Sequence, residues 1–276
     1  MKICHIFSKD GEELYGLFDP ATPAEVAVLE GNLFGEWRIT ERRVMIGRFL
    51  PPVIPSAIFA LGFNYGKHAA ETGAKAPTAP VVFMKAPTSV VGHGEVIMLP
   101  AAGPAKVDYE AELAVVIGKI CKNVRPSEAL EAVLGYTCAN DVSARDWQMD
   151  KERGQNGQWV RGKSFDTFCP LGPVLVTKDE LVNPGRLRVR SVLNGQVMQD
   201  ALTDSMIFDV PAIISELSRS MTLLPGTVIL TGTPEGVGFT RQPPVFLKEG
   251  DVIDIEIEGI GRLSNPVRCE PPVTVG

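Results

Sequence analysis

The segment Asp108-Tyr109-Glu110-Ala111-Glu112 places two carboxylates two positions apart, directly before an apolar run that ends at Ile117. A run rich in valine and isoleucine is typical of a buried strand. Residues i and i+2 of a strand point to the same face, so Glu110 and Glu112 should project side by side. Adjacent carboxylates repel each other, and burial adds a desolvation cost. A divalent cation would relieve both, and oxygen ligands favour Mg²⁺, Mn²⁺ or Ca²⁺. The alternative is an edge strand with two solvated acids.

A third carboxylate, Asp141, follows the short apolar segment Tyr136–Asn140. Side chains at strand ends often converge on a site. Asp141 could therefore complete an open, three-acid Mg²⁺ site. The other interpretation is that Asn140-Asp141 forms an ordinary turn.

The pair His68-x-x-Glu71 lies in a glycine-containing segment. On a helix these residues would be at i and i+3, where Glu71 could orient His68 and make it a better general base. The flanking glycines would let the segment move as a lid. A surface helix pair is the plainer interpretation.

Two further loops carry polar residues of interest. Lys163 follows a glycine in Arg161–Asp166 and could equally be a solvated surface charge. The glycine-rich stretch 231–238 could cradle an anion through its backbone N–H groups, or form a plain β turn. It lacks the Lys-Ser/Thr of a P-loop, so nucleotide binding is weakly supported.

The composition excludes several classes of protein. A net charge of −6 over 276 residues argues against nucleic acid or an anionic membrane as partner. The five cysteines have no CxxC spacing, which argues against a zinc ribbon or a thioredoxin-type pair. The first residues do not resemble a signal peptide, and no apolar run approaches about 20 residues. We therefore expect a cytoplasmic protein with no membrane segment.

The apolar patterns predict many short strands and few helices, which favours a mixed β (α+β) roll or sandwich over a doubly wound α/β fold. Helices are expected at Ser127–Leu134 and Phe208–Leu224, and Asn194-Gly195 predicts a hairpin. The strands are expected at 81–84, 113–117, 174–176, 187–193, 228–231 and 252–257. In the last strand, Ile253, Ile255 and Ile257 alternate with acids, which predicts one wet face.

The chain divides near a proline-rich connector that contains Pro51, Pro52 and Pro55. Residues 1–54 should form a small strand-rich unit, and residues 55–276 the catalytic domain.

Five motifs in this order resemble the fumarylacetoacetate hydrolase family over roughly residues 55–268. They are Gly62-Phe63-Asn64-Tyr65 with His68 and Glu71, Tyr109–Ala114, Asn140–Asp146, Gly162–Asp166, and Thr231–Pro234 with Gly236–Gly238. Within the family, Lys163–Pro173 and Pro243–Leu247 look most like the branch of fumarylacetoacetate hydrolase domain-containing protein 2.

The resemblance implies a β-roll fold and a homodimer. It also implies a bound Mg²⁺ or Mn²⁺ ion, which Ca²⁺ could replace in a crystal. It implies that the metal ligands are Glu110, Glu112 and Asp141. It also implies a catalytic lid dyad of His68 and Glu71, a catalytic and substrate-binding Lys163, and substrate contacts by Arg145, Gln148 and Thr233.

Such a site suits a small 2-oxo acid, whose carbonyl a metal can polarise as a Lewis acid. We expect first a hydrolase that cleaves carbon–carbon bonds of acylpyruvate-like 2,4-dioxo acids through a metal-stabilised enolate. The alternative is an oxaloacetate tautomerase or decarboxylase, or an isomerase of unsaturated 2-oxo dioic acids, because these reactions share the enolate. A non-catalytic binding protein is a third interpretation, which the complete set of acids, dyad and lysine disfavours.

Overall fold

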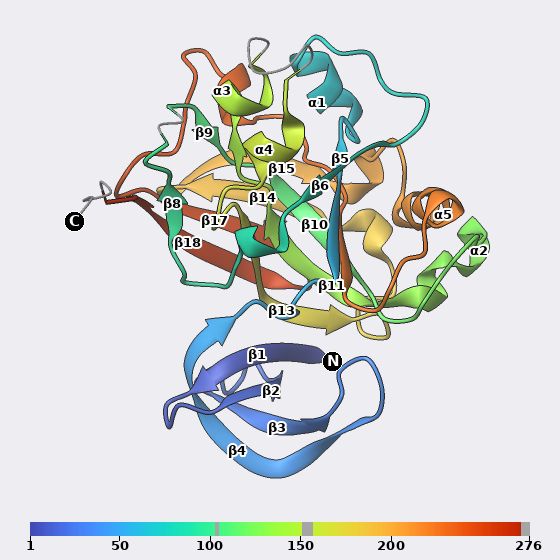
Figure 1. The fold of residues 1–276 in the computed structure, drawn as a ribbon. Helices are drawn as coiled ribbons and strands as arrows, with labels where there is room; N and C mark the ends of the chain where they lie inside the picture. Colours follow the sequence, from blue (N-terminus) through green and yellow to red (C-terminus); the bar gives the residue numbers. More distant parts are fainter. Residues whose placement is uncertain (103–104, 151–156, 272–276) are drawn as a thin grey trace.

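A large sheet of eleven strands runs through the molecule (Figure 1). The computed structural model describes residues 1–102, 105–150 and 157–271. In order across this sheet lie β2 (Glu13–Phe18), β3 (Glu25–Gly31), β4 (Trp37–Leu50), β1 (Lys2–Ser8), β13 (Cys169–Thr177), β11 (Val133–Asn140), β10 (Ala111–Ile117), β16 (Thr227–Leu230), β5 (Ala57–Gly62) and β6 (Val81–Lys85), with β7 (Val90–Val91) paired to β13.

A second sheet has the order β15 (Gln196–Leu202), β14 (Arg188–Leu193), β17 (Val252–Ile257), β18 (Gly261–Cys269) and β8 (Ile97–Leu99), and β12 (Ser143–Ala144) pairs with β9 (Val107–Asp108). The α-helices are α1 (Gly66–Glu71), α2 (Pro126–Ala129), α3 (Arg145–Gln148), α4 (Trp159–Lys163) and α5 (Val210–Ser220). Single 3₁₀ turns lie at Pro87–Ser89, Leu130–Ala132, Pro184–Arg186, Thr203–Ser205 and Gly238–Thr240. The predicted mixed β fold with few helices is confirmed.

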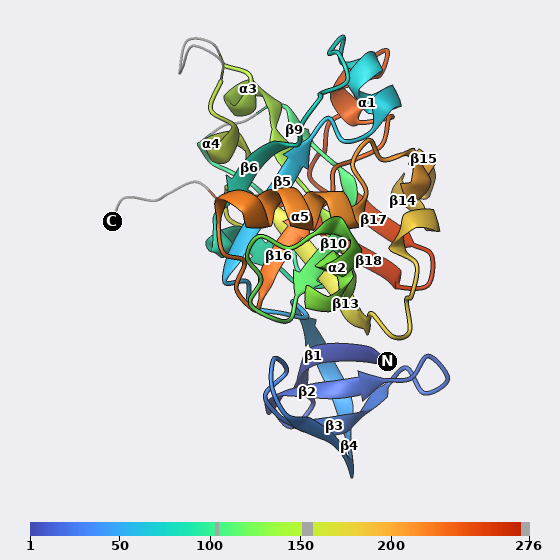
Figure 2. The same cartoon turned by 90° about the vertical axis from the view of Figure 1, so that its right-hand side faces the viewer.

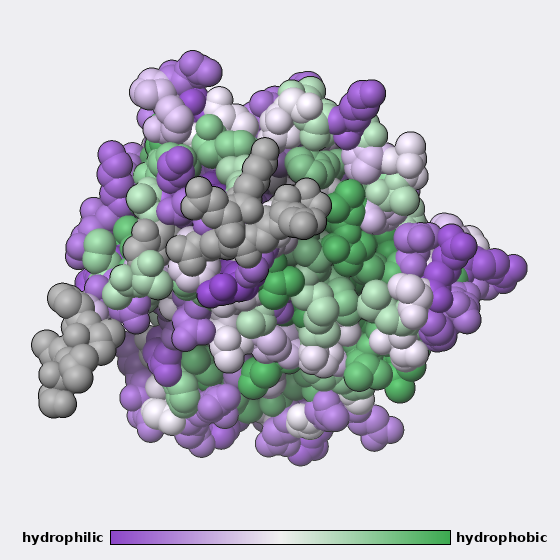
Figure 3. All heavy atoms as spheres, turned by 45° about the horizontal axis from the view of Figure 1, so that its top comes forward, coloured by the Kyte–Doolittle hydropathy of each residue, from purple (hydrophilic) through white to green (hydrophobic). Residues whose placement is uncertain are grey.

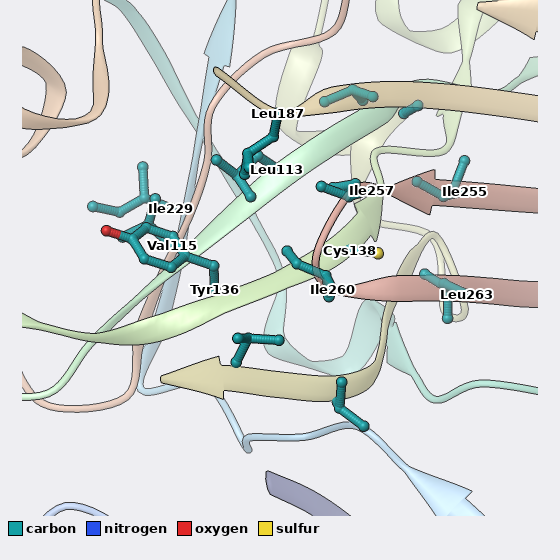
Figure 4. Close-up of a cluster of buried hydrophobic side chains, with 14 of the residues drawn as sticks. Leu113, Val115, Tyr136, Cys138, Leu187, Ile229, Ile255, Ile257, Ile260 and Leu263 are labelled. Carbon is teal, nitrogen blue, oxygen red and sulfur yellow. The ribbon is translucent and has the colours of Figure 1, made fainter. Parts of the chain in front are cut away.

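The main core lies between the two sheets, as Figure 4 shows. Leu113 and Val115 of β10 point to the same side as Tyr136 of β11, toward Ile255 and Ile257 of β17. The alternate residues of β10 pack into a second cluster on the opposite face. Every residue of β10 is therefore buried, which explains why its sequence is continuously apolar after Glu112. This strand is a rigid base for the acids at its start.

Helix α5 confirms the predicted helix, although with shorter ends. Asp209 caps it by accepting a hydrogen bond from the Ala212 N–H at 2.9 Å, and a proline occupies its first turn. Ile213 and Leu217 bury its apolar face. In Figure 2, α5 crosses in front of β16 and β10, with α2 beside it.

Two sequence expectations need correction. The helix expected at Ser127–Leu134 ends at Ala132, and Val133 begins β11, because this stretch pairs with β10 in the sheet. The expected wet face of β17 is only partly wet, since Asp254 is 7% exposed and lies near Arg262. The hairpin at Asn194-Gly195 is confirmed, and both residues have positive φ (51° and 82°).

The first four strands gather at one end of the molecule, below the rest in Figure 1. They join the large sheet where β1 pairs with β13, with Lys2 opposite Val176. The division into units 1–54 and 55–276 stays a prediction, and residues 272–276 lie outside the described part of the chain. In the described ranges we find no helix that is long and apolar enough to cross a bilayer.

Candidate active site

A cavity of about 360 Å³ opens at the end of the molecule that carries α1, α3 and α4. Figure 3 looks onto this end and shows apolar side chains gathered over its middle, with hydrophilic ones toward the rim. The polar residues of the cavity wall include His68, Glu110, Arg145, Gln148, Lys163 and Thr233, and its apolar walls include Phe63, Phe83, Trp159 and Phe239. The structure thus brings predicted site residues from five separate sequence segments to one cavity.

The three predicted ligand acids lie together. One oxygen from each of Glu110, Glu112 and Asp141 lies within 4.8 Å of the others, and all three residues are buried. The ends of β10 and β11 position them, because Ala111 pairs with Asn140 in the antiparallel ladder. The Asn140 side chain accepts a hydrogen bond from the Glu110 N–H at 3.0 Å, which fixes the chain just before β10.

Glu112 is the acid that most needs a cation. Its Oε2 accepts a hydrogen bond from the Gly232 N–H at 2.6 Å, whereas Oε1 is buried without a hydrogen-bond partner among the described residues. Burial raises the pKa of Glu112 well above its usual value, and Asp141 and Glu110 raise it further. Gly232 has φ +95°, and a Cβ there would lie 2.7 Å from Asn64 Cβ, so a side chain would disturb this contact. An orphaned carboxylate oxygen in a three-acid cluster fits a hard divalent cation.

Two buried lysines neutralise part of this cluster. Lys163 Nζ donates to Glu110 Oε2 at 2.7 Å and to Asp141 Oδ2 at 2.6 Å. Burial favours the neutral lysine, but the charges of Asp141 and Glu110 outweigh it and raise the pKa of Lys163. Burial likewise opposes ionisation of Glu110, but Lys163 and Arg145 leave the pKa of Glu110 lowered.

Lys85 is a site residue that the sequence analysis missed. Its Nζ donates to Asp141 Oδ1 at 2.6 Å, to the Val142 carbonyl at 3.2 Å and to the Lys163 carbonyl. It is 1% exposed and lies at the end of β6. The only signal for it was a lysine that ends an apolar strand, which normally indicates a surface residue.

Replacing Lys85 with methionine should destabilise the protein by about 3–5 kcal/mol, because it leaves the buried Asp141 carboxylate with one cation in place of two. Urea unfolding of Lys85→Met would measure this loss. Lys75→Met removes an exposed lysine and is the matched control. Equal stability of the two variants would contradict the importance of the Lys85–Asp141 pair.

Arg145 and Gln148 lie on the cavity wall as a linked pair. Arg145 Nη1 donates to Gln148 Oε1 at 2.9 Å, and Nε donates to Asp108 Oδ2 at 2.9 Å. Nη2 lies 2.6 Å from Glu110 Oε1 but makes no hydrogen bond of proper geometry to any described residue. Four buried carboxylates therefore face three buried cations, counting Asp108 and Lys85, so a net charge of −1 remains if all are ionised.

The predicted dyad forms on α1. His68 Nδ1 and Glu71 Oε1 are 2.8 Å apart. Burial opposes ionisation of Glu71, but the hydrogen bond with His68 helps to lower the pKa of Glu71. An ionised Glu71 accepts the Nδ1 proton, which leaves the other ring nitrogen, Nε2, with a lone pair that can accept a proton. Phe63, with φ 57°, stacks its ring on His68 with the centroids 6.2 Å apart and helps to hold the imidazole.

Thr233 lies on the cavity wall, but its hydroxyl is already engaged. It donates to the Ala111 carbonyl at 3.1 Å and accepts from Gln199 Nε2 at 2.7 Å. Gln199 also accepts a hydrogen bond from the Ala111 N–H at 2.9 Å. In this structure the two side chains fix the start of β10, and substrate contact by Thr233 stays a prediction.

A family profile described as "Fumarylacetoacetate (FAA) hydrolase C-terminal" matches residues 57–268. The chain belongs to the fumarylacetoacetate hydrolase family. This result confirms the resemblance of the sequence motifs, and the protein is therefore an enzyme of a family that has tautomerase, isomerase and hydrolase members.

The similar proteins carry different activities in their names. The chain is 49% identical over 226 residues to "Oxaloacetate tautomerase fahd2, mitochondrial" of Xenopus laevis, covering 82% of this chain and 69% of that one. It is 40% identical to the structure of a 2-hydroxyhepta-2,4-diene-1,7-dioate isomerase from Mycobacterium marinum, with a TM-score of 0.82 over 98% of this chain and 99% of that one. Fumarylacetoacetate hydrolase of Exiguobacterium antarcticum is 37% identical, with a TM-score of 0.85 over 98% and 100% of the two chains.

Proposed function

We propose that this protein interconverts the keto and enol forms of oxaloacetate or a closely related 2-oxo dicarboxylic acid, with Mg²⁺ or Mn²⁺ bound by Glu110, Glu112 and Asp141. The observation that carries the proposal is the ordered dyad beside the acid cluster: His68 lines the same cavity as Glu110 and Lys163. The tautomerase named among its relatives supports this substrate over an acylpyruvate. Oxaloacetate tautomerisation, the alternative expected from the sequence, is thus preferred to the hydrolysis of acylpyruvates that was expected first.

The chain supplies a base and a place for the substrate carboxylate. A bound divalent cation would act as a Lewis acid on the 2-oxo group and so acidify the neighbouring C–H. His68 Nε2 takes that proton while Glu71 stabilises the imidazolium, and it returns the proton to the oxygen or to the carbon. Arg145 Nη2 lies 2.6 Å from Glu110 Oε1 but makes no hydrogen bond within the described residues, so it can donate to the substrate carboxylate, and Gln148 holds the neighbouring nitrogen. Lys163 keeps a positive charge near the oxygen that becomes anionic.

Hydrolysis of a 2,4-dioxo acid is the second candidate, favoured by the apolar wall. Phe63, Phe83 and Trp159 pack edge to face, with ring centroids 5.4 to 5.7 Å apart, and line the cavity. Such a wall suits an apolar acyl chain better than a second carboxylate. The same dyad would then activate a water molecule for attack on the distal ketone.

Assays with oxaloacetate and acetylpyruvate separate these candidates. With Mg²⁺ present, the enzyme should accelerate the approach of oxaloacetate to keto–enol equilibrium without release of CO₂. The absorbance of the enol measures this rate. Rapid CO₂ release would identify a decarboxylase. Cleavage of acetylpyruvate with no effect on oxaloacetate would restore hydrolysis as the function.

We also propose a homodimer as the working form. Sedimentation velocity would test it, and a single monomer species at micromolar concentration would contradict it.

A further inference from the structure

Asp108 is a fully buried carboxylate that lies outside the group of metal-ligand acids. Its Oδ1 accepts the N–H groups of Tyr109 at 2.8 Å and Gly238 at 2.7 Å. Its Oδ2 accepts Phe239 N–H at 3.1 Å and Arg145 Nε–H at 2.9 Å. Four donors fill the acceptor sites of this carboxylate, and one of them belongs to a cavity-lining cation.

The contacts of Arg145 leave one nitrogen, Nη2, with an ion pair to Glu110 but no hydrogen bond among the described residues. Asp108 holds Nε and Gln148 holds Nη1, both at 2.9 Å. The Phe239 ring lies against the guanidinium, with its centroid 4.4 Å from Cζ. The planar guanidinium is thus fixed on two edges and one face. Nη2 lies 2.6 Å from Glu110 Oε1 at the cavity, without a hydrogen bond of proper geometry in the described part of the chain.

The same carboxylate fixes the loop that closes the cavity beside Arg145. Gly238 N–H and Phe239 N–H both donate to Asp108, and a Cβ on Gly238 would lie 2.5 Å from Asp108 Oδ1 and 1.8 Å from the Val245 carbonyl oxygen. At its other contacts the loop is bound to Glu71, which accepts from Gly236 N–H at 2.9 Å and from the Thr240 hydroxyl at 3.1 Å. Asp108 and Glu71 therefore hold one short loop between them.

We propose that Asp108 is a positioning residue for substrate binding, which orients the Arg145 guanidinium and the Phe239 ring so that Nη2 faces the carboxylate of the substrate. This inference rests on the proposed role of Arg145 in binding a 2-oxo acid. Asp108 itself does not line the cavity, so it acts through its hydrogen bond with Arg145.

The test is the affinity of Asp108→Asn for oxalate, measured by calorimetry on Mg²⁺-loaded protein. The oxygen of an asparagine can still accept the Tyr109 and Gly238 N–H groups, but an NH₂ group in the place of Oδ2 can accept neither Arg145 Nε–H nor Phe239 N–H. Loss of one charge-assisted hydrogen bond should reduce oxalate affinity by about 10- to 100-fold. Mg²⁺ affinity should be unchanged. Asp200→Asn is the matched control, because Asp200 accepts two hydrogen bonds from Arg188 on the exposed surface, at 2.7 and 2.6 Å.

A double-mutant cycle with Arg145→Lys separates positioning from a general structural role. If Asp108 acts through Arg145, the double variant should bind oxalate no more weakly than Arg145→Lys alone. Additive losses, or a folded Asp108→Asn protein with wild-type oxalate affinity, would overturn the proposal.

Hydrogen exchange of the arginine Nε–H groups by NMR gives a result that does not depend on a folded Asp108 variant. The Arg145 signal, assigned by its absence in Arg145→Lys, should exchange far more slowly than those of exposed arginines. Fast exchange of this signal in wild type would also overturn the proposal. If wild type neither binds oxalate nor acts on oxaloacetate, the proposed function fails, while slow exchange would still support the fixed Asp108–Arg145 pair.

Discussion

Glu112→Gln should lose divalent-cation binding while the cation-free protein becomes at least as stable as wild type. The carboxylate of Glu112 is buried beside Asp141 and Glu110, so it contributes repulsion when no cation is bound. A glutamine removes that repulsion and keeps an oxygen that can accept the Gly232 N–H. Because the substitution removes a direct ligand, it should weaken Mg²⁺ or Mn²⁺ binding by more than about 100-fold. This is a larger loss than is usual when a residue that only orients a ligand is replaced.

Two measurements on the same protein check this expectation. Calorimetric titration with Mn²⁺ gives the affinity, and thermal unfolding in a chelator gives the stability of the cation-free form. Glu41→Gln, at an exposed position, is the matched control. Wild-type Mn²⁺ affinity in Glu112→Gln, or a clear fall in its unfolding temperature without metal, would remove Glu112 from the metal site.

His68→Asn should reduce turnover of the true substrate by about 10²- to 10⁴-fold, the usual contribution of a positioned general base. An asparagine NH₂ group can still donate to Glu71, so α1 and the loop bound to Glu71 should keep their places. An amide cannot take up a proton at neutral pH, so the chemical step should fail while Mg²⁺ and oxalate still bind.

The matched control is His93→Asn. His93 Nδ1 accepts the Ser264 N–H at 3.1 Å, which an asparagine oxygen can also do, and His93 does not line the active-site cavity. Near-normal kcat in His68→Asn would show that another group moves the proton. Loss of Mg²⁺ binding in the same variant would mean that His68 has a role in the acid cluster instead.

The sequence predicts the strands well where burial leaves a simple pattern. β10 and β16 are buried on both faces and are continuously apolar after Glu112 and Thr227, and β17 alternates. The pattern is ambiguous at Val133 and Leu134, which extend the apolar stripe of a helix but fit a strand equally well. The strand forms because Val133 pairs with Ile117 of β10, a contact that the local sequence pattern does not contain.

The acids of the site were predictable because Glu110 and Glu112 lie two positions apart at the start of a buried strand, where carboxylates need a cation to be stable. Lys85 and Asp108 were not predictable, for a common physical reason: each is charged, and its burial depends on a partner far away in the sequence. Lys85 is 56 residues from Asp141, and Asp108 is 37 residues from Arg145. No local pattern reveals such pairs.

The two lysines also bear on the order in which the mature enzyme is assembled. The acid cluster was expected to need a divalent ion to be tolerable, but Lys85 and Lys163 already give Asp141 two ammonium partners. We therefore expect the polypeptide to reach its native state before any ion arrives, unlike small zinc domains that remain unfolded until they are loaded. The proposed ion would then be an exchangeable accessory, and the metal supply of the cell, more than the folding pathway, would decide which one the enzyme carries.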